Sequence, residues 1–205
     1  MNFKVTLLKK ENYRPTFWSG GMAKELTTYP INSDYASRNF LWRLGVAKID
    51  IDKSEFSSLP GVSRNLMVTE GSITLMHKDK YTKELTEFNQ DTFIGDWHTT
   101  TNGKASVFNL MTRENYSGTL KVLDVLSMNN IEFVPLDIRD KKLTTICLYP
   151  IFGSFKVKLN GDYYNIEEND LLVVNCTLNT SITNLTLENT TNKNTKVIVS
   201  SIYYS

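Results

Sequence analysis

Residues 155–174 read FKVKLNGDYYNIEENDLLVV, a run that alternates between apolar and charged side chains before a turn. Phe155, Val157 and Leu159 share one face of an extended chain, and two lysines share the other. Asn160-Gly161 is a strong signal for a two-residue hairpin turn. The chain then returns through 163–166, and an acidic turn at 168–170 leads into an apolar strand at 171–174.

The N-terminal half follows the same order. Ile73 and Leu75 share a face, a polar turn at 78–80 follows, and a second run leads to a strand at 90–94. The two halves are therefore related by a repeat of about 80 residues. Because long 3.6-residue periods are scarce, we predict an all-β fold with two packed β-barrels, 1–115 and 116–205. Helix is expected to be minor, with short turns at 53–59 and 123–128.

Composition narrows the class of protein. The chain has 205 residues, 40% of them hydrophobic, a net charge of +1, and 23 basic residues spread along its length. The basic residues form no stripe of the kind that would indicate nucleic-acid binding, and no segment approaches the roughly 20 apolar residues of a membrane span. Without a recognisable signal peptide, we expect a cytoplasmic protein in which Cys147 and Cys176 are buried free thiols. The Asn- and Thr-rich segment 175–195 is expected to be an exposed hairpin or a loop.

Residues 12–21, NYRPTFWSGG, gather several groups with chemical potential. The guanidinium of Arg14 suits a carboxylate, and adjacent glycines allow close backbone approach. Two interpretations of this segment stay open. It is either a tight bend that anchors Trp18 in a core, or a bend that presents Ser19 and the backbone of Gly20 to a ligand.

Arg43 is the sharpest single candidate. In residues 40–47, FLWRLGVA, it shares a face with Leu41, Gly45 and Ala47 rather than with other polar groups. A buried charge needs a partner, because an unpaired one costs several kcal/mol, on the order of 3–5. That partner is either Glu25 or an anionic ligand, or both together. Arg64 carries the same ambiguity but lies nearer a predicted loop.

Three further residues are candidates for ligand contact. Asn109 lies on a predicted strand with Val107 and Met111, and its amide can donate and accept hydrogen bonds. Asp96 either orients Arg43 or caps a turn. Trp97 either forms a pocket wall or packs in the core.

Taken together, these motifs resemble the HutD/Ves family. The resemblance is dense from Phe3 to Met111, and it is carried by residues 12–21, Glu25, Phe40–Arg43, Pro60-Gly61, Gly95–Trp97 and Phe108–Met111. It implies a bicupin of two jelly-roll barrels that binds a small ligand or regulates, linked to histidine utilisation or to a stress response. Family members commonly have an acidic residue where this chain has Val107.

Metal and nucleophilic chemistry are disfavoured. Metal-binding cupins carry a His-x-His motif, a Glu and a later His, but this chain has two histidines, and the matching segment 60–71 contains none. We expect His77 to be a solvated strand end, while His98 could line a pocket. A pair of Ser19 with His98 is a minor alternative, and no Gly-x-Ser-x-Gly elbow is present.

Three hypotheses follow. The first is a regulatory bicupin, without metal or cofactor, that binds a small anionic metabolite and associates with neither nucleic acid nor membrane; a homodimer is compatible with it. Its predicted ligand-binding residues are Arg14, Trp18, Ser19, Gly20, Glu25, Arg43, Asp96, Trp97 and Asn109. The second is a metal-free isomerase or hydrolase with Glu25 or His98 as base. The third is a structural interaction module.

Overall fold

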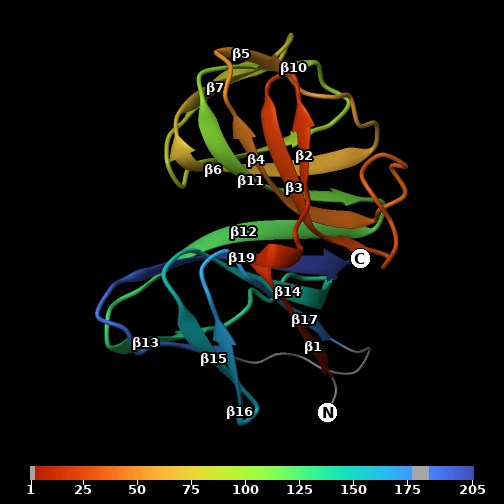
Figure 1. Cartoon of the computed structure of the whole chain (residues 1–205). Helices are drawn as coiled ribbons and strands as arrows, with labels where there is room; N and C mark the ends of the chain where they lie inside the picture. Colours follow the sequence, from red (N-terminus) through yellow and green to blue (C-terminus); the bar gives the residue numbers. More distant parts are fainter. Residues whose placement is uncertain (1–2, 177–184) are drawn as a thin grey trace. The chain divides into compact units, whose positions relative to one another are not determined.

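The computed structural model describes residues 3–176 and 185–205, and these residues form nineteen strands and one 3-10 turn, η1 (Lys10–Asn12). No α-helix occurs among them. The chain divides into two compact units, one of Tyr13–Gly118 and one of Met1–Asn12 with Thr119–Ser205. The predicted all-β class is therefore confirmed (Figure 1).

The Tyr13–Gly118 unit is built from two open antiparallel sheets. The six-stranded sheet has the order β2-β3-β4-β11-β6-β9, with bounds Pro15–Trp18, Gly21–Tyr29, Trp42–Ile49, Ala105–Arg113, Val62–Gly71 and Gln90–Ile94. The four-stranded sheet has the order β5-β10-β7-β8, with bounds Lys53–Glu55, Thr99–Asn102, Ile73–His77 and Tyr81–Leu85.

The other unit also has two sheets. The five-stranded sheet has the order β1-β17-β14-β19-β12, with bounds Phe3–Leu8, Leu171–Cys176, Lys142–Phe152, Thr195–Tyr204 and Tyr116–Val125. The four-stranded sheet has the order β13-β18-β15-β16, with bounds Asn129–Phe133, Leu185–Asn189, Phe155–Leu159 and Asp162–Ile166.

The two units repeat one topology. Strands β4-β11-β6-β9 and β5-β10-β7-β8 of the first unit correspond, eight strands later, to β12-β19-β14-β17 and β13-β18-β15-β16 of the second. Each set of eight strands follows the double-sheet arrangement of a jelly roll. The predicted repeat of strand, turn and strand is therefore a repeat of the whole eight-strand pattern.

Each unit buries apolar side chains between its own two sheets. In Tyr13–Gly118 the core draws on both sheets, with Leu66, Val68, Ile73, Leu75, Leu85, Phe93, Ala105 and Val107. In the other unit the core is larger and made of aliphatic and aromatic side chains from every strand between β12 and β19. Burial of this apolar area is the main stabilising contribution in both units.

Several predictions need correction. Closed barrels are not confirmed, because all four sheets are open. Residues 53–59 and 123–128 were expected to be helical turns, but β5 and β12 occupy much of these segments as strands. The segment 1–115 was expected to form one barrel, but β1 pairs with β17 over the register Phe3↔Cys176 to Leu8↔Leu171. The first strand therefore completes the sheet of the C-terminal unit.

The predictions made from local turn and strand patterns agree with the structure. Asn160 and Gly161 both have positive φ, 50° and 91°, as a two-residue hairpin requires. The predicted strands at 90–94 and 155–159 coincide with β9 and β15. Cys147 is buried and Cys176 is half-buried, and both are free. The segment 175–195 falls partly on residues 177–184, which lie outside the described residues; β18 lies in its remainder.

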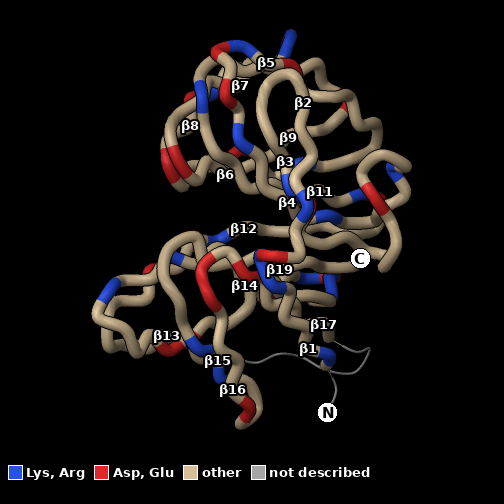
Figure 2. Tube along the Cα trace, viewed as in Figure 1, with Lys and Arg blue, Asp and Glu red and all other residues tan. Residues whose placement is uncertain are grey.

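Charge is evenly distributed. Figure 2 shows basic and acidic positions interspersed along both units, in keeping with the net charge of +1. Within the described residues, no helix is long and apolar enough to cross a membrane.

The Ser19-Gly20 turn of the β2–β3 hairpin generates a stability prediction. Gly21 pairs with Trp18 and has a φ of 151°, and a Cβ there would overlap the backbone carbonyl of Lys48. We expect Gly21→Ala to cost roughly 3 kcal/mol or more in urea denaturation, because strain and clash add. Gly61→Ala is the matched control, since Gly61 also has positive φ but nothing lies within 4 Å. Equal losses in both variants would contradict the clash.

Candidate functional site

Arg43 lies on the face of β4 that the sequence predicted. Its side chain is buried at 9% exposure, and its Nε donates a 2.8 Å hydrogen bond to Oε2 of Glu25 on β3. The guanidinium lies over Gly45, where a Cβ would come within 2.9 Å of Nη1 and 3.1 Å of Nη2. Glycine at this position therefore lets Arg43 lean along the sheet toward Glu25.

Arg43 and Arg64 flank the same residue in the ladder. Met111 on β11 is opposite Arg43 on β4 and opposite Arg64 on β6. Cross-strand partners share a face, and neighbouring strands are about 4.8 Å apart, so the two arginine backbones are separated by about 10 Å. Long side chains on one face can meet across that distance. We call the face that carries Glu25, Arg43, Arg64 and Asn109 the arginine face.

Arg64 is more deeply buried than Arg43 and has no counter-ion. Its exposure is 4%, and none of the described residues forms a hydrogen bond or ion pair with its guanidinium, whose Nε is left without an acceptor. Two aromatic rings provide partial compensation: the Arg64 Cζ lies 4.5 Å from the Phe56 ring centre and 5.3 Å from that of Phe93.

The charge of Arg64 is costly in this setting. Burial lowers the pKa of Arg64 well below its ordinary value, to about 10, with Tyr35 opposing the shift and Arg43 reinforcing it. Because the pKa still lies above neutrality, the guanidinium is charged at physiological pH. A buried cation without an anion is the arrangement that a bound anion would relieve.

Two more side chains complete the surroundings. The ring of Tyr35 lies 4.8 Å from Cζ of Arg43 and packs against a small core formed by Phe40, Leu59, Val62 and Met111. Asn109 is opposite Gly45 in the ladder, is 7% exposed, and has an Oδ1 with no hydrogen-bond donor among the described residues. The arginine face therefore offers both a donor group and an acceptor atom without partners.

The residues of 12–21 do not join this cluster. Arg14 and Ser19 are exposed, and neither forms a hydrogen bond or ion pair with another described residue. Trp18 is 39% exposed and folds its ring over Gly20 at the end of the hairpin. The bend does not anchor Trp18 in a core, because the indole lies at the surface.

The loop before β10 is structural. Asp96 Oδ2 accepts a 2.9 Å hydrogen bond from the backbone N–H of Gly61, so it caps a turn and does not orient Arg43. Trp97 packs edge-on against the rings of His77 and Tyr81, at 5.5 and 5.9 Å between centres.

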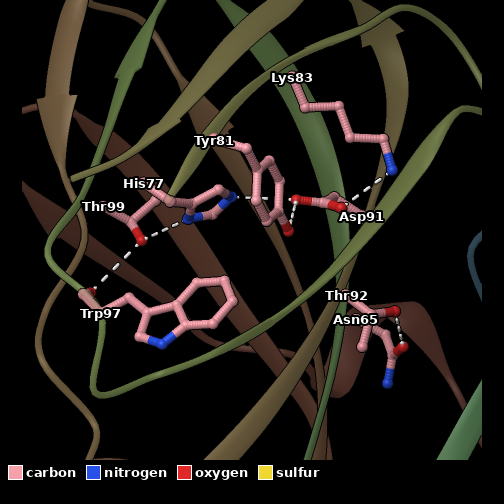
Figure 3. Close-up of polar contacts among 8 residues, drawn as sticks. All are labelled: Asn65, His77, Tyr81, Lys83, Asp91, Thr92, Trp97 and Thr99. Atoms are coloured by element: carbon pink, nitrogen blue, oxygen red, sulfur yellow. Dashed lines mark hydrogen bonds and ion pairs between the residues drawn. The ribbon is translucent and has the colours of Figure 1, made fainter. Parts of the chain in front are cut away.

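His77 was predicted to be solvated, and this is wrong. It is 3% exposed, and Figure 3 shows its imidazole between Thr99 and Asp91, at 2.8 Å from Nδ1 and 3.0 Å from Nε2. Tyr81 and Lys83 donate to the same carboxylate at 3.0 and 2.9 Å. His77 and its network partners come from four different strands, β7 to β10, so no local pattern in the sequence could place them together.

Asp91 holds this network together. Burial alone would raise the pKa of the Asp91 carboxyl, but hydrogen bonds from Lys83, His77 and Tyr81 outweigh it and lower the pKa below the usual 3.8. An ionised carboxylate only accepts, so Nε2 of His77 must carry a proton. Thr99 is fully buried, and His77 and Asp91 are 3% and 5% exposed.

His98 lies at the surface, away from the arginine face. His98 is half exposed, and its Nδ1 lies 3.2 Å from Oε1 of Glu55. No hydrogen bond joins it to Ser19 in the described part of the chain. Within residues 3–176 and 185–205, no group of three or more His, Cys, Asp or Glu side chains is placed to hold a metal ion.

The predicted set of ligand residues is therefore divided. The structure brings Glu25, Arg43 and Asn109 onto one face and leaves Arg14, Trp18, Ser19, Gly20, Asp96 and Trp97 elsewhere in the unit. Arg64 was not in the predicted set of ligand residues. Its place on the buried face could have been predicted, because residues 62–68 alternate in the sequence as clearly as residues 41–47. Tyr35 and Phe56 lie in loops, and no sequence signal marked them.

The comparisons agree with this architecture. The HutD family model matches residues 10–192. The chain belongs to the HutD family. A search of the curated proteins finds no match.

Solved structures extend the comparison to the fold. HutD from Pseudomonas fluorescens is 18% identical with a TM-score of 0.72, covering 98% of this chain and 100% of that one. A conserved protein of unknown function from Pseudomonas aeruginosa is also 18% identical, with a TM-score of 0.81 and coverage of 97% and 98%. Bacillus subtilis oxalate decarboxylase is 9% identical with a TM-score of 0.66, covering 95% and 76%. These likenesses place this HutD-family chain among cupin-like all-β folds.

The unpaired charge of Arg64 predicts a gain in stability on its removal. We expect Arg64→Met to raise the free energy of unfolding by about 1–3 kcal/mol, because the desolvated cation is replaced by an apolar side chain of similar length. Arg14→Met, at an exposed position, is the control and should change stability by less than about 0.5 kcal/mol.

The same variant has a defined pH dependence. The folded-state pKa of Arg64, about 10, lies below that of arginine in the unfolded chain, so the cost of the charge is fully present below about pH 10 and shrinks above it. The gap between wild type and Arg64→Met in urea denaturation should narrow as the pH is raised past 10. A destabilised variant at pH 7 would mean that the guanidinium has a counter-ion.

Asp91→Asn tests the His77 network. Asparagine keeps one acceptor oxygen but has no charge, so the substitution removes the ion pair with Lys83 and leaves at least one of the His77, Tyr81 and Lys83 donors without its acceptor, at an expected cost of about 2–4 kcal/mol at pH 7. The pKa of Asp91 is depressed, so its contribution is present above the ordinary 3.8 and is lost as the pH falls through the lower folded value. Wild type and variant should converge in acid. Asp50→Asn, at an exposed ion pair with Lys48, is the control and should show neither effect.

Proposed function

We propose that this HutD-family protein binds a small anionic metabolite on the arginine face and acts in regulation rather than catalysis. The observation that carries the proposal is the guanidinium of Arg64, which is 4% exposed and has no carboxylate or other acceptor among the described residues. Removing a charge from water without a partner is expensive, and sites retained at such a cost commonly serve a ligand.

The surroundings suit a small organic acid. Arginine forms paired hydrogen bonds with a planar carboxylate, and the aromatic rings of Phe56, Phe93 and Tyr35 supply the apolar surface typical of small-molecule sites. Asn109 Oδ1 adds an acceptor that could fix the orientation of a ligand N–H or O–H. An acid with a carboxylate and a neighbouring polar group would satisfy both.

The proposal includes the bicupin architecture, with one cupin-like barrel in each unit. The repeat of eight strands supports it. Both buried arginines among the described residues lie in Tyr13–Gly118, whereas the core of the other unit is apolar. We therefore assign ligand binding to the first unit. Family membership further favours a cytoplasmic role in histidine utilisation.

The rival hypotheses gain less support. A purely structural module would satisfy its arginines with its own carboxylates; Glu25 does this for Arg43, but no described residue does it for Arg64. For an enzyme, Glu25 and His98 were the expected bases. Glu25 is engaged with Arg43, and His98 is a surface residue paired with Glu55.

A thermal-shift experiment tests the proposal. The protein would be heated with formate, urocanate and formylated amino acids, at constant ionic strength. Formate is a reasonable first probe because HutD from Pseudomonas fluorescens has been studied in a formate condition. A ligand at about 100 times its Kd should stabilise the fold by about 2.7 kcal/mol. We expect at least one acid to raise the Tm of wild type.

Variants decide where that acid binds. Arg64→Met should abolish the shift, and Arg43→Met should weaken it, while Arg14→Met should leave it unchanged. Absence of a shift with every acid, or a shift that survives in Arg64→Met, would overturn the proposal.

A further inference from the structure

The arginine face carries a built-in anion. Glu25 occupies β3 opposite Gly45, and its carboxylate holds Arg43 at 2.8 Å. Its side chain is 35% exposed, compared with 9% for that of Arg43 and 4% overall for Arg64. The carboxylate is therefore at the more solvated end of the group, and the unpaired guanidinium is at the buried end.

The charges of this face can be counted. Arg43 and Arg64 contribute two positive charges, and Glu25 contributes one negative charge. Arg113 lies opposite Val62 at the end of the same face, and Glu114 pairs with it at 3.6 Å. Asp91 on β9 is the cross-strand partner of Leu66, and its negative charge is compensated by Lys83, whose Nζ lies 2.9 Å from Oδ1. Asp96 is exposed and bonded to the Gly61 N–H. Among the described residues, the face therefore carries one positive charge that is not compensated, and it belongs to Arg64.

We infer that the site selects monoanionic carboxylic acids over dianionic ones, and that Glu25 is the residue that sets this preference. The inference rests on the proposed function, since it concerns the charge class of the ligand that Arg64 binds. One carboxylate neutralises the face. A second carboxylate would bring a further negative charge beside Glu25, because Arg43 is already occupied.

Because the arginine face is buried, its net charge has a strong effect on the binding of charged ligands. Charges in a medium of low effective dielectric interact several times more strongly than in bulk water, and an uncompensated charge there is disfavoured. The partial exposure of Glu25 weakens but does not remove its repulsion of a second carboxylate. The same geometry gives the reverse result when Glu25 is neutral: two guanidinium groups about 10 Å apart at their backbones then face the ligand, and a dianion can pair with both.

Oxamate and oxalate form a matched pair of probes. They have the same number of heavy atoms and both are planar, but at about pH 8 oxamate carries one negative charge and oxalate carries two. Calorimetric titrations at fixed ionic strength give the two dissociation constants. We expect wild type to bind oxamate more tightly by about tenfold or more.

Glu25→Gln assigns the preference to its residue. The substitution keeps the shape and removes the charge, so the ratio of the two constants should move toward oxalate by about tenfold or more. Glu84→Gln is the matched control, because Glu84 is exposed on β8 in the same unit and undergoes the same change of charge. Its ratio should equal that of wild type. Glu25→Asp, which retains the charge, should keep the preference for oxamate.

The outcomes separate this inference from the proposed function. If formate or oxamate binds in an Arg64-dependent way but the oxamate-to-oxalate ratio is the same in wild type and Glu25→Gln, the selectivity is overturned and the function stands. If wild type prefers oxalate, the selectivity is overturned without any variant, so the test does not depend on the folding of Glu25→Gln. If wild type binds neither oxamate nor oxalate, the selectivity is overturned, and if it also binds none of the acids of the thermal-shift panel, the proposed function itself fails.

Discussion

Two guanidinium groups share one buried face of a sheet, and only one of them, that of Arg43, is paired with a carboxylate among the described residues. This imbalance of charge is the main constraint on the Tyr13–Gly118 unit. Glycine at position 45 leaves room for Arg43 to lean on Glu25, and stacked rings of Phe56 and Phe93 cover Arg64. The hydrophobic cluster of the unit offers no acceptor to either cation, and the buried carboxylate of Asp91 is bonded to His77, Tyr81 and Lys83. The unpaired charge of Arg64 therefore lowers the stability of the fold, and side chains from neighbouring segments pack around its guanidinium.

The eight-strand repeat allows the two halves of the chain to be compared position by position. Both halves use the same strand order and the same pair of sheets. In the C-terminal half the space between the sheets is filled by aliphatic and aromatic side chains, and its buried carboxylate, Asp170, lies in a turn where Lys9 pairs with it at 2.7 Å. One half thus behaves as a hydrophobic scaffold, while the other half of the same pattern retains buried charges.

Alternation along single strands could be read from the sequence, and contacts between strands could not. Residues 155–159 and the face of Arg43 were predictable because each depends on side-chain parity within one strand. Arg64 was visible by the same rule. His77 was not, because its burial depends on Asp91 and Thr99, which reach it from other strands. The Trp18–Gly21 segment was predicted to contribute to a ligand site, because glycine and tryptophan occur in hairpin turns as well as in ligand sites and the sequence does not distinguish the two. β1 eluded prediction because its partner, β17, follows it by more than 160 residues along the chain.

The pairing of β1 with β17 has a consequence for how the chain is made. Synthesis proceeds from the N-terminus, and domains generally fold as they emerge. The unit Tyr13–Gly118 is continuous in sequence and can fold as soon as its last strand is available. β1 precedes this unit in the sequence, yet its partner β17 follows the unit, so the backbone groups of β1 stay unpaired until β17 has been made. Synthesis of the whole Tyr13–Gly118 unit therefore separates the two strands of this pair in time.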